Sequence, residues 1–96
     1  MRSKNRFGMG LKQLREITGV TQEDFGLVSS RTYISTVERG LKSPTLGKIE
    51  QIAEVLGIHP LALVTAGYMD KLTAKEIERT TDLLRKQLLD LIGETQ

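Results

Sequence analysis

Apolar residues recur along this chain at the three- and four-residue spacing of amphipathic helices, and no segment shows the alternation of a half-buried strand. The stripe over residues 7–18 ends just before Gly19, and the clearest stripe, over residues 46–56, ends just before Gly57. Glycine suits the left-handed conformation that closes many helices. The pattern predicts an all-α protein with helices at these two positions.

Capping residues mark two further helix starts in the first half of the chain. Thr21 is followed three residues later by Asp24, and this pair predicts a capping box that opens a second helix. Ser30 suits the cap of a third helix. Within that helix Ile34 and Val37 share one face, which we expect to point into the core.

Two more helices are predicted in the second half. Pro60 favours the first turn of a short helix that ends at Gly67. Thr73 with Glu76 predicts another capping box, and the helix that it opens runs to Ile92. Its roughly 19 residues span about 28 Å at the rise of an α-helix, which is long for a chain of this size.

Composition indicates one small domain. Hydrophobic residues make up 39% of the 96 positions and charged residues 27%, and the four aromatic side chains predict a mostly aliphatic core. Cysteine is absent, and no apolar run has the form of a signal peptide or the length of a membrane helix. We therefore expect a cytoplasmic protein with no disulfide and no membrane segment.

The net charge of +2 conceals an uneven distribution. Residues 1–48 hold nine basic and four acidic side chains, a net charge of +5, whereas residues 49–96 carry a net charge of −3. This polarity indicates a first half that binds a polyanion and a second half that packs or meets a partner. A basic face that is only solvated is the alternative.

Several motifs of the first half occur together. They are Leu-Arg-Glu at 14–16, Gly-Val-Thr-Gln-Glu-Asp-Phe-Gly at 19–26, Ser-Arg-Thr-Tyr-Ile-Ser at 30–35, Val-Glu-Arg-Gly at 37–40 and Ser-Pro-Thr-Leu at 43–46. In combination they closely resemble the Cro/C1-type helix-turn-helix family, and the match continues to about residue 58. The stretch 31–35 particularly resembles the recognition helix of controller proteins from restriction-modification systems.

The resemblance implies a five-helix, lambda-repressor-like DNA-binding domain over residues 1–70, preceded by a basic N-terminal arm, with a long C-terminal helix appended over residues 71–96. It also implies that the third predicted helix reads DNA from the major groove. The function expected from it is a sequence-specific regulator of transcription, either a repressor or an autoregulator, that acts by occupying an operator in double-stranded DNA.

The candidate DNA contacts follow from this match and from helix geometry. Side chains away from the Ile34 and Val37 face are free to meet base edges, where arginine can donate two hydrogen bonds to guanine. The base-reading candidates are Arg31, Thr32, Tyr33, Ser35 and Thr36. The phosphate-binding candidates implied by the resemblance are Gln22, Arg39, Lys42 and Ser43. The candidates for arm contacts with DNA are Arg2, Lys4 and Arg6.

Some of these side chains have a second interpretation. Arg31 is also compatible with an ordinary solvated charge or a phosphate contact. Tyr33 is compatible with half-buried packing as well as with a contact to DNA. The hydroxyls of Thr32, Ser35 and Thr36 are compatible with plain polar surface.

Other motif positions are expected to serve the fold. Arg15 and Glu38 match the family positions that form an internal ion pair between the first and third helices. Gly26 stands where the family usually has alanine, and we expect a close approach of helices there. Between Gly26 and Ile34 the chain is two residues shorter than the common family pattern. Either the second helix ends earlier or the turn is tighter.

The predicted C-terminal helix carries a wide apolar stripe. The members that fall closest together on a helical wheel are Ile77, Leu84, Leu88 and Leu91. We expect this stripe to be the interface of a homodimer, with packing on the chain's own core as the alternative. A dimer would place two recognition helices on a palindromic operator, with half-sites a turn or more of duplex apart.

No catalytic or cofactor motif is present. His59 is the single histidine, and beside a helix start we expect it to act as a cap or to pack. The chain offers no clustered metal ligands, no phosphate-binding glycine loop and no evident pocket for a small-molecule effector. We expect no enzyme and no cofactor. The alternative function is an antitoxin-like or other protein-interaction module whose C-terminal helix binds a partner protein.

Overall fold

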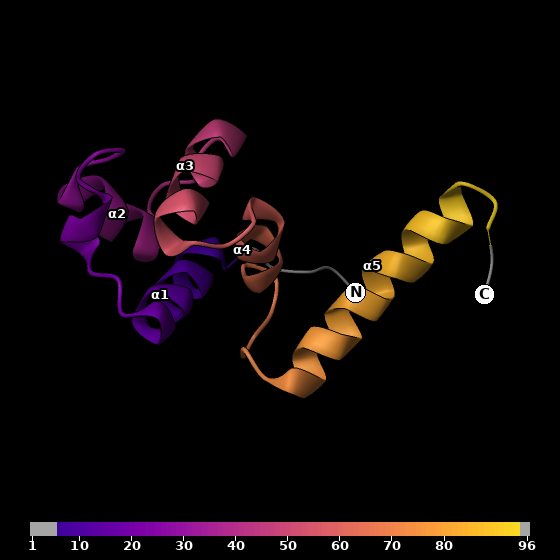
Figure 1. The fold of residues 1–96 in the computed structure, drawn as a ribbon. Helices are drawn as coiled ribbons and strands as arrows, with labels where there is room; N and C mark the ends of the chain where they lie inside the picture. Colours follow the sequence, from indigo (N-terminus) through magenta and orange to yellow (C-terminus); the bar gives the residue numbers. More distant parts are fainter. Residues whose placement is uncertain (1–5, 95–96) are drawn as a thin grey trace.

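The computed structural model describes residues 6–94. Within this range the chain forms helices and no strand. In order they are α1 (Phe7–Thr18), the single 3-10 turn η1 (Gln22–Phe25), α2 (Arg31–Glu38), α3 (Leu46–Leu56), α4 (Pro60–Ala66) and α5 (Ala74–Leu91). The first four α-helices and η1 form a globular unit from which α5 extends (Figure 1). The predicted all-α architecture with an appended C-terminal helix is confirmed.

Local signals set most of the helix boundaries. Gly19 and Gly57 follow α1 and α3 with φ of 77° and 75°, as predicted for left-handed caps. The Ser30 hydroxyl accepts a hydrogen bond from the amide of Tyr33 at 3.0 Å, so the predicted cap of α2 is confirmed. These interactions satisfy amide and carbonyl groups that would otherwise lack partners at the helix ends.

The two predicted capping boxes have different outcomes. At η1 both bonds form, since Thr21 Oγ1 accepts from the Asp24 amide at 3.2 Å and Asp24 Oδ2 accepts from the Thr21 amide at 2.8 Å. At α5 the Thr73 hydroxyl accepts from the Glu76 amide at 3.2 Å. The Glu76 carboxylate instead accepts from Arg79 at 2.8 Å, so α5 is capped but its capping box is incomplete.

The second predicted α-helix is wrong in type and length. The segment that follows Thr21 makes one 3-10 turn, which ends at Phe25, and a non-helical stretch leads from there to Ser30. Phe25 is fully buried, so its packing anchors the turn without a longer helix. Of the two explanations for the shorter spacing before Ile34, the earlier end of the second helix is the one observed.

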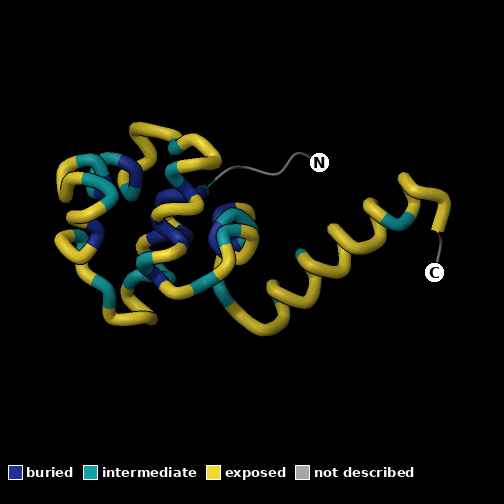
Figure 2. The backbone as a smooth tube through the Cα atoms, turned by 45° about the horizontal axis from the view of Figure 1, so that its top comes forward, coloured by how far each residue is buried: buried dark blue, intermediate teal, exposed yellow. Residues whose placement is uncertain are grey.

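The core lies among α1, η1, α2, α3 and α4 and is mostly aliphatic, as predicted. Its largest fully buried side chains are Phe25, Leu11, Ile34, Ile52, Leu63 and Val37. The buried positions gather in the globular unit, whereas no residue of α5 is buried (Figure 2). Ile34 and Val37 therefore face inward as predicted, which turns the opposite side of α2 toward solvent.

Close helix approach occurs at glycines of α1 and not at Gly26. A Cβ atom at Gly8 would meet the carbonyl oxygen of Val37 and lie 2.7 Å from that of Glu38. A Cβ atom at Gly26 would meet only the carbonyl oxygen of Glu23, one turn back, at 3.3 Å. The expectation for Gly26 was wrong because η1 ends there and no second helix crosses it.

The described residues include no single helix that is both long and apolar enough to cross a membrane. The pair formed by α3 and α4 reaches that length and composition together, with a bend of 102° between its members. Both helices bury residues in the core of the globular unit.

Candidate nucleic-acid interface

The side chains of helix α2 that are predicted to contact bases become less exposed from its start toward its end. Arg31 and Thr32, at its first turn, are exposed, while Ser35 and Thr36 are half-buried further along. The Thr36 hydroxyl donates to the carbonyl oxygen of Thr32 at 2.8 Å, so part of its hydrogen-bonding capacity is used inside the helix. The first turn is thus the part of α2 that is most open to a ligand.

Arg31 is held by an acidic side chain of η1 that sequence reasoning did not single out. Its Nε atom lies 2.8 Å from Oε2 of Glu23, with 67% of the Arg31 side chain and 64% of the Glu23 side chain exposed. The pair is made through Nε, and two-thirds of the Arg31 side chain stays exposed. A guanidinium can donate two hydrogen bonds to O6 and N7 of guanine.

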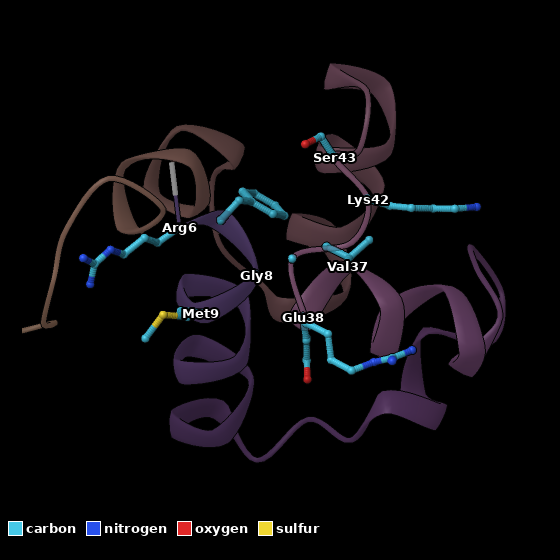
Figure 3. Close-up of a pocket in the computed structure, with 10 residues that line it drawn as sticks. Arg6, Gly8, Met9, Val37, Glu38, Lys42 and Ser43 are labelled. Atoms are coloured by element: carbon cyan, nitrogen blue, oxygen red, sulfur yellow. The ribbon is translucent and has the colours of Figure 1, made fainter. Parts of the chain in front are cut away.

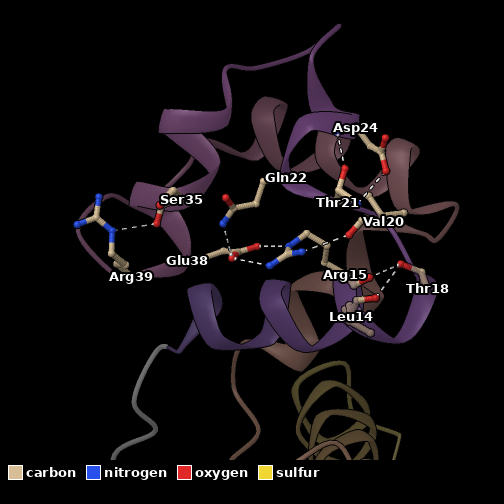
Figure 4. Close-up of polar contacts among 10 residues, drawn as sticks. All are labelled: Leu14, Arg15, Thr18, Val20, Thr21, Gln22, Asp24, Ser35, Glu38 and Arg39. Carbon is tan, nitrogen blue, oxygen red and sulfur yellow. Dashed lines mark hydrogen bonds and ion pairs between the residues drawn. The ribbon is translucent and has the colours of Figure 1, made fainter.

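A buried ion pair fixes the end of α2 to α1. Glu38 Oε2 accepts from Arg15 Nε at 2.6 Å and Oε1 accepts from Arg15 Nη2 at 3.1 Å (Figure 4). The two side chains are only 14% and 5% exposed, so the predicted internal pair is confirmed. The hydrogen bonds that Arg15 donates to Glu38 raise the pKa of Arg15 above its usual value.

Gln22 joins the same pair from η1. Its Nε2 atom donates to Glu38 Oε1 at 3.0 Å, so the Glu38 carboxylate receives three hydrogen bonds from two elements (Figure 4). Gln22 thereby braces α2 against η1. A phosphate contact by Gln22 stays a prediction.

Tyr33 packs at the edge of the core between two lysines. It is half-buried, and the ammonium groups of Lys42 and Lys48 lie 5.8 Å and 5.7 Å from its ring centroid. Lys48 Nζ also donates to the carbonyl oxygen of Val28 at 2.6 Å, which ties α3 to the stretch before α2. Sequence reasoning missed Lys48, because no local spacing shows that α3 reaches this stretch.

The loop after α2 adds further basic and polar side chains. Arg39, Lys42 and Ser43 are exposed, and Arg39 Nε donates to the carbonyl oxygen of Ser35 at 3.4 Å. Together with the start of α1 this loop lines a pocket, in which the side chains of Arg6 and Lys42 extend in opposite directions (Figure 3). The side chains of the loop that are predicted to bind phosphate are therefore accessible and lie beside α2.

Only one of the three arm candidates can be placed. Arg6 Nη1 lies 3.1 Å from Oδ1 of Asp70, and its backbone amide donates to Gly67 at 2.6 Å. Arg6 therefore ties the start of α1 to the segment that follows α4. Arg2 and Lys4 lie outside the described residues.

Nothing in residues 6–94 groups three or more potential metal ligands. His59 is exposed, and its Nδ1 atom accepts from the amide of Leu61 at 3.0 Å. The histidine therefore caps α4, in agreement with one of its two predicted roles.

A one-turn helix and a turn that lead into a braced helix with an exposed first turn form the arrangement of the helix-turn-helix class of DNA-binding proteins. A family model described as helix-turn-helix matches residues 11–63, more than half of the chain. The chain belongs to this family, the Cro/C1-type helix-turn-helix proteins, which are DNA-binding regulators of transcription and not enzymes.

Relatives sharpen the comparison. A stretch of 60 residues, 60% of this chain, is 37% identical to the HTH-type transcriptional regulator y4dJ of Sinorhizobium fredii and covers 78% of it. Over 58 residues, 57% of this chain, it is 43% identical to the control protein C.MunI of a Mycoplasma species and covers 78% of that protein.

A solved structure is similar as well. The crystal structure of the restriction-modification controller protein C.AhdI from Aeromonas hydrophila superposes with a TM-score of 0.57 and 35% sequence identity. The superposition covers 60% of this chain and 91% of that protein. The chain is therefore similar to restriction-modification controller proteins, as its recognition-helix sequence predicted. Helix α5 begins after the range that the family model matches.

Proposed function

We propose that this chain is a cytoplasmic transcriptional regulator of the restriction-modification controller type. It binds a palindromic operator in double-stranded DNA as a homodimer and acts as a repressor or autoregulator by occupying that site. The observation that carries the proposal is the first turn of α2, where Arg31 and Thr32 are exposed while Glu38, at the other end of the helix, is locked to Arg15 and Gln22.

The proposed reading assigns different tasks to the exposed groups. Arg31 donates two hydrogen bonds to a guanine, and the hydroxyls of Thr32, Ser35 and Thr36 meet neighbouring base edges. Tyr33 remains packed beside Lys42 and Lys48 at the edge of the core, where its ring can contact a thymine methyl or the DNA backbone. The phosphate contacts are assigned to Gln22, Arg39, Lys42 and Ser43, with the N-terminal arm as a further contact. Phosphate contacts position the protein, whereas base contacts carry specificity.

The homodimer follows from the limits of one recognition helix and from α5. A single helix contacts only a few base pairs, so a symmetric dimer on a palindrome multiplies the discrimination. Leu88 and Leu91 of α5 are 63% and 82% exposed, and contiguous exposed apolar surface marks sites of protein contact. A second copy that covers these side chains would bury the leucines and provide the two-fold axis that a palindromic operator requires.

The test is selection of binders from randomised duplex DNA with the purified chain at near-physiological salt, followed by sequencing of the enriched pool. The proposal expects an inverted repeat with a guanine in each half. Enrichment of a single half-site would support sequence-specific DNA binding but reject the dimer. No enrichment by a protein with an intact helical circular dichroism spectrum would reject the regulator and favour the protein-interaction module.

A further inference from the structure

Helix α5 carries a heptad pattern that its own globular unit leaves open. Ile77, Thr81, Leu84, Leu88 and Leu91 follow one another at alternating spacings of four and three residues, which is the core seam of a coiled coil. Most charged side chains lie away from this seam: Glu76 pairs with Arg79, and Asp82 pairs with Lys86 and with Arg85, which flanks the seam. The apolar seam thus lies opposite most of the charged side chains.

The exposure of this seam changes along α5. Near its start Ile77 and Leu84 are 42% and 40% exposed, whereas Leu88 and Leu91 are 63% and 82% exposed. The first part faces α4 across an apolar groove. The groove is lined by Leu61, Ala62, Met69, Leu72, Ile77 and Leu84, with further residues around them. Each chain therefore has an apolar groove at one end of α5 and a bare apolar ridge at the other.

We propose that α5 pairs with α5 of a second copy in antiparallel orientation, so that the ridge of each chain fills the groove of the other. Aligning the two helices end to end sets Ile77 beside the partner's Leu88 and Thr81 beside the partner's Leu84. The outermost layer joins Ala74 to the partner's Leu91. Every seam residue then has a partner, and the dyad crosses α5 midway between Asp82 and Leu83.

Charges beside the seam select this alignment. Glu78 and Arg85 occupy the equivalent flanking position one heptad apart, each directly after a seam residue. In the end-to-end antiparallel pair Glu78 meets the partner's Arg85, and the contact occurs twice by symmetry. Sliding by one heptad in either direction would instead bring Arg85 against the partner's Arg85, or Glu78 against the partner's Glu78.

A parallel pair gains nothing from these charges. In a parallel coiled coil, a flanking residue of one helix meets the partner's flanking residue five positions away in the sequence. Glu78 would then face the partner's Thr73, and Arg85 would face the partner's Thr80. The antiparallel pair also sends the two globular units to opposite ends of α5, whose 18 residues span about 27 Å. The length of α5 thus sets how far apart the two recognition helices stand.

Charge reversal gives the first test, with sedimentation equilibrium as the measurement. Glu78→Arg and Arg85→Glu each turn both attractions into repulsions, so we expect each to raise the dimer dissociation constant about tenfold, since exposed ion pairs are individually weak. A mixture of the two variants restores both attractions and should form a heterodimer with wild-type affinity. Asp90→Arg and Lys86→Glu, which make the same charge changes away from the seam, should leave the constant unchanged.

Single cysteines give a second, geometric test, because the chain has none of its own. With Ala74→Cys alone or Leu91→Cys alone, the two thiols of an antiparallel dimer lie far apart and no disulfide forms. An oxidised mixture of these variants should give the mixed disulfide. Self-linked Ala74→Cys dimers, or reversals that leave the constant unchanged, would overturn the antiparallel pair.

This inference rests on the homodimer of the proposed function but not on DNA reading. A chain that sediments as a monomer at all concentrations would overturn both the pair and the homodimer. Selection from randomised DNA would still decide whether such a monomer recognises a half-site, so the two failures are distinguishable.

Discussion

The buried ion pair between α1 and α2 gives the sharpest quantitative prediction. Arg15→Ala removes two of the three hydrogen bonds received by the Glu38 carboxylate, whose side chain is 5% exposed in the intact protein, and leaves Gln22 as its remaining partner. Breaking a buried pair by deleting one partner costs about 3 to 5 kcal/mol, because the remaining charge lacks compensation. A domain of this size has about 5 to 15 kcal/mol of stability in total, so the loss is a large share.

Urea unfolding followed by circular dichroism at pH 7 measures this loss. We expect Arg15→Ala to lose about 3 to 4 kcal/mol, equivalent to roughly 15 to 25 °C in melting temperature. Arg79→Ala, which removes an exposed arginine of α5, is the control and should leave the urea midpoint of the globular unit nearly unchanged. A loss below about 1 kcal/mol would refute the reasoning.

Three further predictions concern the reading face and α5. Arg31→Ala should cost about 1 to 3 kcal/mol on the selected operator and little on random DNA, measured by fluorescence anisotropy; equal losses on both would reduce Arg31 to a phosphate contact. Glu23→Ala should lower the ratio of operator to random-DNA affinity, because Arg31 Nε loses its anchor, whereas uniformly tighter binding to both would mean that Glu23 only repels phosphate. Glu76 should titrate below its ordinary value of 4.5 by NMR, because the hydrogen bond from Arg79 lowers its pKa, and should return toward that value in Arg79→Ala. This contact therefore stabilises the folded helix at pH values above the ordinary pKa of Glu76, and the stabilisation is lost as pH falls through the lowered pKa.

Helix boundaries could be predicted wherever a single residue decides them. Gly19 and Gly57 end their helices because a left-handed residue stops the helical ladder, and this depends on little beyond the residue itself. Thr21 and Ser30 open theirs because a short side-chain oxygen reaches an amide three residues ahead. Such contacts span one turn, so the sequence alone contains both partners and their spacing.

Contacts between elements that are distant in the sequence were harder to predict. The pairing of Arg15 with Glu38 could be predicted only through the family resemblance, since 23 residues separate the two. The contacts of Lys48 with Val28 and of Arg31 with Glu23 had no such guide, because they depend on how α3 and η1 pack beside α2. The type of η1 was missed for the same reason: burial of Phe25, and not local propensity, holds that turn.

The shorter stretch before α2 still leaves several elements in contact with the reading helix. Although η1 has only one turn, Glu23 pairs with Arg31 at the start of α2 and Gln22 bonds Glu38 at its end. Near the start of α2, Lys48 of α3 bonds the Val28 carbonyl and lies over the Tyr33 ring, and Arg15 of α1 locks the end of α2 through Glu38. Since α1 and α3 supply these two groups, the direction of α2 depends on the core that joins those helices. The missing two residues therefore shorten the second helix, while the exposed first turn of α2 keeps its support.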